Sequence, residues 1–305
     1  MRRAASHLVL VAGLAWAVAL AAGCADSAPS APPPGQGKPL RILSLTPNVT
    51  EVLFAMGLGQ KVVGRSTYCT YPPEVQAVPA VGDTLQINLQ EVIRLQPTVA
   101  LLVTRRDEVP RRLQGLGVRT VSLQSDRMNQ MLDAIRTIGR ETGHEAAAQA
   151  LLDRIQADLG GVRRSVAGLS RPKVLFAFPM TVGSSRIMVA GRGTFVGDLL
   201  DVAGAENAYP ETADWPTVGP QQVVALAPEV VIINATGEDA PPDRAQAIRR
   251  AWASLESVPA VANGRVHILT EPYLTIPGPR VGQAARLLAE TIHPDLRDAA
   301  KGAKP

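Results

Sequence analysis

The run of residues 144–166 constrains the fold of this chain more than any other part of the sequence. It is rich in alanine, the residue with the highest helix propensity. Its apolar residues recur at three- and four-residue spacing and so form one stripe, made of Leu151, Leu152, Ile155 and Leu159. The pattern predicts one continuous α-helix of about 22 residues, roughly 33 Å long. A helix of that length is expected to join two lobes as a rigid strut.

The segments on either side of this helix repeat one another. Residues 90–102 and 221–233 each predict a short helix, a turn at Pro97 or Pro228, and a buried strand. The two copies lie about 131 positions apart. Self-similarity at so long a period indicates two related domains rather than a solenoid of short repeats.

Strands and helices alternate through both halves, which predicts an α/β fold of two Rossmann-like lobes with largely parallel sheets, joined by one long rigid α-helix. The expected strands are 41–45, 61–64, 98–103, 118–123, 173–178, 229–234 and 265–269. One expected helix starts at Asn48 or Thr50 with Glu51 in its first turn, and the others are 89–95, 111–116, 128–141, 194–203, 221–226, 243–252 and 281–292. The expected parts are a signal peptide (1–23), a disordered tether (24–39), an N-terminal lobe (40–143), the inter-lobe helix (144–167) and a C-terminal lobe (168–305).

The N-terminus carries a targeting signal. Arg2 and Arg3 precede an apolar stretch, 8–22, that is too short for a membrane-spanning helix. Small residues then lead to Cys24, as in the box at which bacterial lipoproteins are cleaved and lipidated, although Ala21 replaces the usual larger aliphatic residue. We expect a lipidated Cys24 and a membrane-anchored extracytoplasmic protein. Ordinary secretion with a free Cys24 is the alternative.

The composition argues against several functions. Net charge is +4 and no basic stripe is present, so nucleic-acid binding is not expected. The sequence has no phosphate-binding loop, no nucleophile elbow and no histidine pair at metal-ligand spacing. We therefore expect neither an enzyme nor a resident cofactor or metal. Cys69 is expected to be a small buried residue, with a metal-ligating thiolate as the alternative.

Several loops are expected beyond the carboxyl ends of the strands, where ligands of parallel α/β sheets bind. These loops are 46–48, 66–72, 82–88, 104–108, 179–192, 208–219 and 270–280. The aromatic residues in these loops include Tyr68, Tyr71, Trp215 and Tyr273. Their shared placement predicts that some of them face one ligand in a cleft between the lobes. The alternative is that each aromatic pins its loop onto its own lobe.

Several motifs together resemble one known family. They are 41–51 (RILSLTPNVTE), 64–74 (GRSTYCTYPPE), 81–83 (VGD), 193–200 (GTFVGDLL), 204–207 (GAEN), 215–218 (WPTV) and 277–280 (PGPR). Over about residues 41–294 the chain is similar to the substrate-binding proteins of ABC importers for cobalamin, haem and ferric siderophores. The resemblance implies two α/β lobes joined by one long helix. It also implies a monomer whose partners are an ABC permease and its ATPase.

Within that family, the Trp-Pro-x-Val and Pro-Gly-Pro-Arg segments are most similar to vitamin B12 (cobalamin) binders. The resemblance implies that the rings of Tyr68 and Trp215 press on a corrinoid, the transported ligand. The other residues that it places at the ligand are Thr46, Thr84, Met180 and Tyr273.

The chain also departs from the cobalamin binders, which leaves a second ligand class open. Thr84 and Val103 stand where such binders have two further tryptophans, for which Tyr273 would compensate. The alternative ligand is haem, with iron bound by Tyr68 or Tyr71, or a ferric siderophore. The cations that would pair with acid groups of such a ligand are Arg105, Arg106 or Arg186.

The family usually presents one glutamate on each lobe to arginines of the permease. Gln90 and Gln221 stand at these positions, at equivalent places in the internal repeat. Glutamine can still hydrogen-bond arginine but without charge assistance, and Glu91 could substitute in the first lobe. The resemblance therefore implies a permease-docking role for both glutamines, and the alternative is that they are ordinary solvated helix residues.

Overall fold

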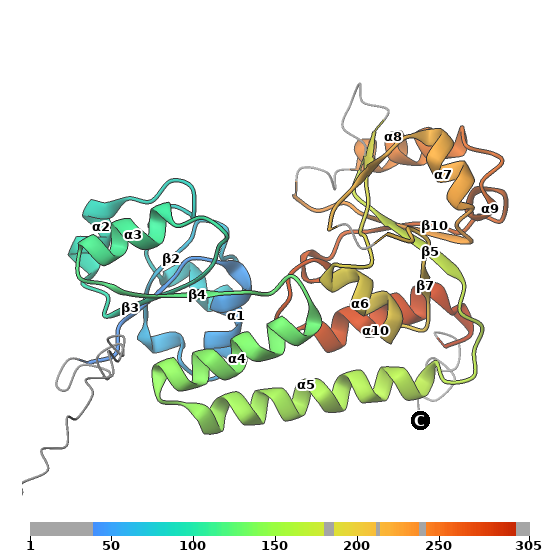
Figure 1. The fold of residues 1–305 in the computed structure, drawn as a ribbon. Coiled ribbons are helices and arrows are strands. Elements are labelled where there is room, and N and C mark those ends of the chain that lie inside the picture. The colour runs from blue at the N-terminus through green and yellow to red at the C-terminus, as the bar shows by residue number, and fades with distance from the viewer. Residues whose placement is uncertain (1–38, 180–185, 212–213, 238–241, 297–305) are drawn as a thin grey trace, which may run out of the picture. The chain divides into compact units, whose positions relative to one another are not determined.

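The computed structural model describes residues 39–179, 186–211, 214–237 and 242–296. Cys24 and Met180 lie outside the described residues, as does the predicted signal peptide. The described chain contains two four-stranded sheets and one two-stranded sheet. Figure 1 shows the long helix α5 that runs beside α4 and α10. No helix in this part of the chain combines the length and the apolarity that crossing a bilayer requires.

The first sheet has four parallel strands in the order β2-β1-β3-β4. They are β1 (Ile42–Ser44), β2 (Val62–Arg65), β3 (Val99–Val103) and β4 (Arg119–Leu123). The helices of this lobe are α1 (Pro47–Ala55), η1 (Gly59–Lys61), η2 (Pro73–Ala77), α2 (Leu89–Leu95), α3 (Glu108–Gly115) and α4 (Met128–Thr142). The central strands β1 and β3 are almost wholly buried, which explains their nearly continuous apolar sequence.

The second sheet is also parallel throughout, in the order β10-β9-β5-β7. Its strands are β5 (Lys173–Ala177), β7 (Glu206–Asn207), β9 (Val230–Asn234) and β10 (Val266–Leu269), and an antiparallel ribbon pairs β6 (Ile187–Met188) with β8 (Thr217–Val218). The helices are α6 (Phe195–Val202), α7 (Pro220–Leu226), α8 (Pro242–Ala253), α9 (Pro259–Ala262), η4 (Pro272–Leu274) and α10 (Val281–Ile292). The predicted α/β fold with two parallel-sheet lobes is confirmed.

The helix α5 (Glu145–Ser165) is continuous, as the alanine-rich run predicted. Its apolar stripe is buried, and the helix packs along α4 at one end and along α10 at the other (Figure 1). Gly160 and Gly161 lie inside the helix and do not shorten it. The helix α4 belongs to the first lobe and α10 to the second. Because α5 packs against both of them, it joins the two lobes.

Two glycines on the neighbouring helices allow α5 to pack closely. A Cβ atom added at Gly139 of α4 would lie 2.6 Å from the Cβ atom of Ala148. A Cβ atom added at Gly282 of α10 would lie 2.5 Å from the Cβ atom of Asp158. Both distances are far below van der Waals contact, so each helix pair depends on having glycine at its point of closest approach.

One continuous buried core links the two lobes. It contains apolar residues of both sheets and of the helices between them, among them Ile42, Leu101, Met131, Leu152, Phe176, Leu199, Ile232 and Leu288. At its edge, the Asp198 carboxylate of α6 accepts hydrogen bonds from Arg127 Nη2 (2.6 Å) and from the Met128 backbone N–H (2.8 Å). An acid of the second lobe therefore stabilises the N-terminus of α4, whose unpaired N–H groups favour negative charge.

The internal repeat predicted from sequence is present in backbone detail. The short helices α2 and α7 both end at a residue with left-handed backbone, Gln96 (φ 45°, ψ 54°) and Ala227 (φ 46°, ψ 53°). A proline follows in each case, and then a central strand, β3 or β9. Left-handed backbone is uncommon for residues other than glycine, so its occurrence at both equivalent positions supports a common origin of the lobes.

Some local expectations were wrong. Glu51 is the fifth residue of α1 and not in its first turn, because the helix already begins at Pro47. The helix α3 begins at Glu108 instead of Arg111, since Pro110 falls in the first turn, where its missing N–H costs no hydrogen bond. The sequence also gave no indication of the two-residue strands β6, β7 and β8, which are too short to show any periodicity.

Candidate binding site

Thr46 lies two residues beyond the carboxyl end of β1, where a ligand residue was expected. Its side chain is half-buried, and Thr46 Oγ1 accepts a hydrogen bond from the backbone N–H of Val103 at 3.3 Å. Thr46 therefore ties the loop after β1 to the carboxyl end of β3. The position agrees with the edge of the sheet at which parallel α/β proteins bind ligands.

A small polar cluster lies beneath this edge and buries Cys69. Ser44 and Thr50 share a hydrogen bond of 2.7 Å between their hydroxyl groups, and the Thr50 hydroxyl donates to Cys69 Sγ at 3.0 Å. Burial is the main cause that raises the pKa of the Cys69 thiol, and the bond from Thr50 partly opposes it. The expectation of a small buried residue is confirmed. In the described part of the chain, no group of three His, Cys, Asp or Glu side chains could hold a metal ion.

Tyr68 stands on the loop that follows β2 and is 67% exposed. Its backbone N–H donates to Ser66 Oγ at 3.2 Å, so the loop is held to the polar cluster at the residue before Cys69. The ring itself is presented to solvent. A large aromatic ring held by its backbone and left uncovered is suited to stacking against a ligand.

Arg280 lies between two tyrosines that come from different lobes. Its guanidinium carbon is 4.0 Å from the ring centroid of Tyr71 and 5.1 Å from that of Tyr273. The guanidinium also forms a bidentate ion pair with Glu51 of α1, with Nε–Oε2 at 2.8 Å and Nη2–Oε1 at 2.6 Å. Arg280 therefore brings together Tyr273, a predicted ligand residue, and Tyr71, another aromatic residue of the predicted loops. From the sequence, Arg280 had been assigned only to the Pro-Gly-Pro-Arg motif of the family.

The Glu51 carboxylate is unusual because it is almost completely buried. The side chain of Glu51 is 2% exposed and that of Arg280 is 13% exposed. Burial is the larger cause and raises the pKa of Glu51, while the hydrogen bonds from Arg280 oppose the increase. A Cβ atom added at Gly278 of the Pro-Gly-Pro-Arg segment would lie 3.7 Å from Glu51 Oε2 and 3.8 Å from the Cα atom of Asn48, so the segment passes close to α1. The segment thus joins the second lobe to α1 of the first lobe.

Asn234 fixes the start of the loop that carries Tyr273. It is buried at the carboxyl end of β9, and its Nδ2 donates to the carbonyl oxygens of Leu269 (3.3 Å) and Glu271 (3.2 Å). Leu269 is the last residue of β10. The side chain therefore holds the chain as it leaves the sheet, immediately before η4 presents Tyr273.

Trp215 is positioned by an aromatic neighbour at the carboxyl end of β5. Its ring centroid lies 5.4 Å from that of Phe178, which in turn contacts Phe176 edge-on at 6.2 Å. Trp215 nevertheless remains 38% exposed. The indole is thus supported on one side and open on another, as an aromatic residue that contacts a ligand should be. Phe178 was missed by sequence reasoning, although its place directly after a buried strand could have indicated it.

Charged groups from both lobes meet next to Trp215. Arg105 Nη2 lies 2.9 Å from Asp126 Oδ2 and 3.2 Å from Asp214 Oδ2. Arg105 and Asp126 come from the loops after β3 and β4, and Asp214 directly precedes Trp215. Arg105, one candidate partner for acid groups of a ligand, is therefore already paired with two carboxylates of the chain.

The remaining predicted ligand residues are less informative. Thr84 is half-buried in the turn between Gly82 and Ile87, where Asp83 Oδ1 accepts from the backbone N–H groups of Leu85 and Gln86. Met180 lies outside the described residues. The structure therefore does not support a ligand contact for Thr84, and it does not test the prediction for Met180.

The two predicted docking glutamines occupy equivalent exposed positions. Gln90 is on α2 and Gln221 is on α7. Three residues further along each helix, and therefore on the same face, stand the exposed apolar residues Ile93 (57%) and Val224 (37%). Each lobe thus presents the same pair of side-chain types, one amide and one β-branched apolar group, from the same element of the repeat.

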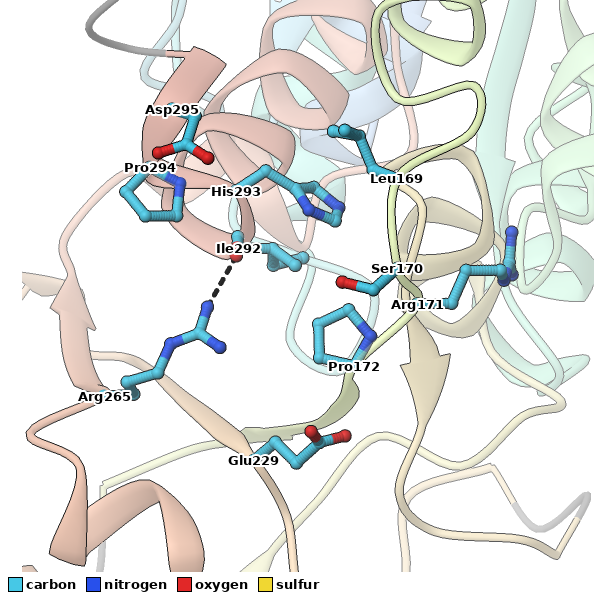
Figure 2. A pocket seen from close by; sticks show the side chains of 10 residues that line it. All are labelled: Leu169, Ser170, Arg171, Pro172, Glu229, Arg265, Ile292, His293, Pro294 and Asp295. Atoms are coloured by element: carbon cyan, nitrogen blue, oxygen red, sulfur yellow. Dashed lines mark hydrogen bonds between the residues drawn. The ribbon is translucent and has the colours of Figure 1, made fainter.

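A separate pocket of about 290 Å³ lies at the opposite edge of the second sheet (Figure 2). Pro172, Glu229 and Arg265, which line it, directly precede β5, β9 and β10. There Arg265 Nη2 donates to the Ile292 carbonyl oxygen at 2.5 Å. None of the predicted ligand residues lines this pocket, and the amino edge of a parallel sheet is not where its ligands bind.

Comparison with known proteins identifies the class. Residues 42–273 match the model of the periplasmic binding protein family, and the chain belongs to that family. Membership of a family of binding proteins also confirms the expectation that the chain is not an enzyme.

Individual relatives are more distant. An uncharacterized ABC transporter substrate-binding lipoprotein of Bacillus subtilis is 28% identical over 263 residues, 85% of this chain and 81% of the relative. A vitamin B12-binding protein of Pectobacterium carotovorum is 24% identical over 261 residues, 83% of this chain and 88% of the relative. The solved structure of a periplasmic haem-binding protein from Pseudomonas aeruginosa has a TM-score of 0.72 at 24% identity, over 84% of this chain and 94% of that one. The structural likeness supports the fold.

Proposed function

We propose that this chain is a monomeric extracytoplasmic receptor that captures a corrinoid between its lobes and delivers it to the permease and ATPase of an ABC importer. The family and the names of its curated relatives support the transport role. The observation that carries the ligand class is the pair of exposed rings, Tyr68 and Trp215, at the carboxyl ends of two different sheets. Rings on two lobes can cover both faces of one flat ligand.

The chemistry of a corrinoid matches these surroundings. Its macrocycle offers a broad apolar surface to aromatic side chains, and its side chains are mostly neutral amides. Arg280 is neutralised by Glu51, and Arg105 is paired with Asp126 and Asp214. Both arginines are therefore paired with acidic side chains of the protein, which leaves them less available to pair with acid groups of a ligand.

Haem is the second candidate, and one observation favours it. Among the described residues the Tyr68 hydroxyl has no hydrogen-bond partner, so it is free to bind ferric iron. The two candidates make different demands on this residue. A corrinoid needs the ring of Tyr68, whereas haem iron needs its oxygen.

The test is therefore a titration of the purified protein with cyanocobalamin, haemin and a ferric hydroxamate siderophore, followed by visible spectra and thermal melting. A true ligand at 100 times its Kd should stabilise the fold by about 2.7 kcal/mol. For a corrinoid, Tyr68→Phe should bind as the wild type does, and Tyr68→Ala should lose about tenfold in affinity, roughly 1.4 kcal/mol. Leu116→Ala, which truncates an exposed apolar side chain immediately after α3, is the matched control. Loss of binding in Tyr68→Phe would instead select haem.

We also propose that α2 and α7 dock onto the permease through Gln90 with Ile93 and Gln221 with Val224. A permease built from two related halves would present the same surface twice, and the repeat of the two lobes offers two matching contacts. Amide groups would accept hydrogen bonds from arginines, and the apolar groups would be buried between the proteins.

The proposed anchor is a lipid on Cys24. Its support is the signal-like N-terminus together with the lipoprotein name of the Bacillus relative. Expression of the full chain in a bacterium should place it in the detergent phase after Triton X-114 partition, and Cys24→Ser should move it to the aqueous phase. A wild-type protein found in the aqueous phase would contradict the anchor without affecting the ligand proposal.

A further inference from the structure

The acid–arginine–acid group next to Trp215 is the most informative feature that the proposed function leaves unexplained. Two carboxylates, Asp126 and Asp214, share the single guanidinium of Arg105, and both of their closest contacts are to the same Nη2 nitrogen. The formal charge of the three side chains is therefore −1 at neutral pH. An ordinary salt bridge would leave no net charge at this place.

The group lies next to Trp215, a proposed ligand residue. Asp214 is the neighbour of Trp215, whose ring packs on Phe178 at the carboxyl end of β5. Arg105 and Asp126 follow the carboxyl ends of β3 and β4 in the other lobe. Side-chain exposures of 70%, 45% and 48% for Arg105, Asp126 and Asp214 show that the charges face solvent and not the core.

Two neighbouring pairs of charges in the site are each neutral overall. Arg106 and Asp107 are adjacent in the same loop and carry opposite formal charges. Arg280 is neutralised by Glu51 in a buried pair. The group of Arg105, Asp126 and Asp214 thus carries an excess of one negative charge, although the chain as a whole is basic at +4.

We infer that Arg105, Asp126 and Asp214 act together as a specificity determinant that disfavours ligands bearing carboxylates and favours neutral ones. The inference rests on the proposed function, because it assumes that the ligand contacts Trp215. Like charges repel across the site, and the repulsion is moderate because the groups are solvated and screened by salt. Arg105 serves to hold the two acids in place, one from each lobe.

The experiment compares pairs of ligands that share one macrocycle and differ in whether they bear carboxylates. Cyanocobalamin is paired with its monocarboxylic acid, in which one side-chain amide is hydrolysed, and haemin dimethyl ester is paired with haemin. For whichever macrocycle binds, the wild type should prefer the neutral member by about threefold at low salt, and the preference should decline as salt is added.

The variant that tests the group is Asp126→Asn with Asp214→Asn, which leaves Arg105 unpaired and should bring the ratio of the two affinities to one or invert it. The matched control is Asp133→Asn with Asp201→Asn, which removes two exposed acids that also pair with arginines, on α4 and α6. It should leave the ratio as in the wild type.

A ratio that is the same in the wild type, the test variant and the control would overturn the inference while leaving the proposed function intact. Equal shifts in the test variant and the control would overturn it too, because they would trace the effect to total charge. Absence of binding to all four probes would overturn the proposed function and the inference together.

Discussion

Arg280 of the second lobe and Glu51 of the first lobe form a bidentate ion pair that is shielded from solvent and covered by the rings of Tyr71 and Tyr273. A buried pair of this kind joins the lobes strongly, because separating its members would leave two unpaired charges in a poorly solvated place. We expect this pair, with α5 and the shared core, to restrict the lobes to modest hinge motion when a ligand binds.

Removal of one member of this pair should be costly. Arg280→Met leaves the Glu51 carboxylate buried without a counter-charge, and we expect a loss of about 3–5 kcal/mol in the free energy of unfolding. The double variant Glu51→Gln with Arg280→Met should lose much less than the sum of the single losses, since no charge is then stranded. Urea unfolding followed by circular dichroism measures all three proteins.

The control for the ion pair is Arg94→Met. Arg94 pairs with Glu91 on the surface of α2, with Nη2–Oε1 at 2.5 Å, and its loss should cost far less than the loss of Arg280. Equal costs for Arg94→Met and Arg280→Met would contradict the structural role given to the buried pair.

The cost of Arg280→Met should also depend on pH. Burial already raises the pKa of Glu51, and without Arg280 the opposing cause disappears, so the pKa rises further. The folded state then holds a proton that the unfolded state releases above about pH 4, and the free energy of unfolding falls as pH rises through this window. We expect the deficit of Arg280→Met to grow between about pH 4 and pH 7, and the deficit of the double variant to stay flat.

Two glycine-to-alanine substitutions around α5 should change the free energy of unfolding in opposite directions. Gly282→Ala places a methyl group against Asp158 and should destabilise the fold by about 1–3 kcal/mol through overpacking between α5 and α10. Gly161→Ala places the same group on α5, where nothing lies within 4 Å, and should stabilise the fold by about 1 kcal/mol through helix propensity. Thermal and urea unfolding of both variants provide the comparison, and a stabilised Gly282→Ala would show that the two helices are not held in close contact.

The amino-acid sequence carried much of the fold because its signals are local. The alanine-rich run with its apolar stripe predicted α5, and the helix predicted at 89–95 has the observed bounds of α2. The repeat at about 131 positions predicted two equivalent lobes. Periodicity and proline turns are properties of neighbouring residues, so they can be recognised without knowing the tertiary structure.

The parts of the site that could not be predicted from the sequence depend on contacts between residues far apart in the chain. Glu51 and Arg280 are 229 positions apart, and neither has a neighbour in sequence that indicates the other. Arg105 and Asp214 likewise meet only because two loops from different lobes come together. The aromatic candidates could be predicted from their loops, whereas the charges that surround them could be assigned only from the structure.

The proposed docking role of Gln90 and Gln221 predicts how added charges at these positions change binding to the permease. Gln90→Glu with Gln221→Glu adds a carboxylate to each proposed contact, where it could form a charge-assisted bond to a permease arginine. We expect this variant to bind the cognate permease–ATPase complex, reconstituted in nanodiscs, at least as tightly as the wild type and to stimulate its ATPase equally. Gln90→Arg with Gln221→Arg should bind at least about tenfold more weakly, since like charges would then face one another.

Ile93→Asp with Val224→Asp tests the apolar half of the same surface, because an aspartate would have to be desolvated on docking. It should weaken binding to the permease complex without changing the affinity for the small ligand, whose candidate residues lie on other loops. Gln149→Arg with Gln156→Arg, on the exposed face of α5, is the control for the Gln90→Arg with Gln221→Arg variant, because it adds the same two positive charges elsewhere. A marked loss of binding in the glutamate variant, or an equal loss in the α5 control, would show that α2 and α7 are not the docking elements. The two glutamines would then be ordinary solvated residues, and the repeat of Ile93 and Val224 would reflect only the common origin of the lobes.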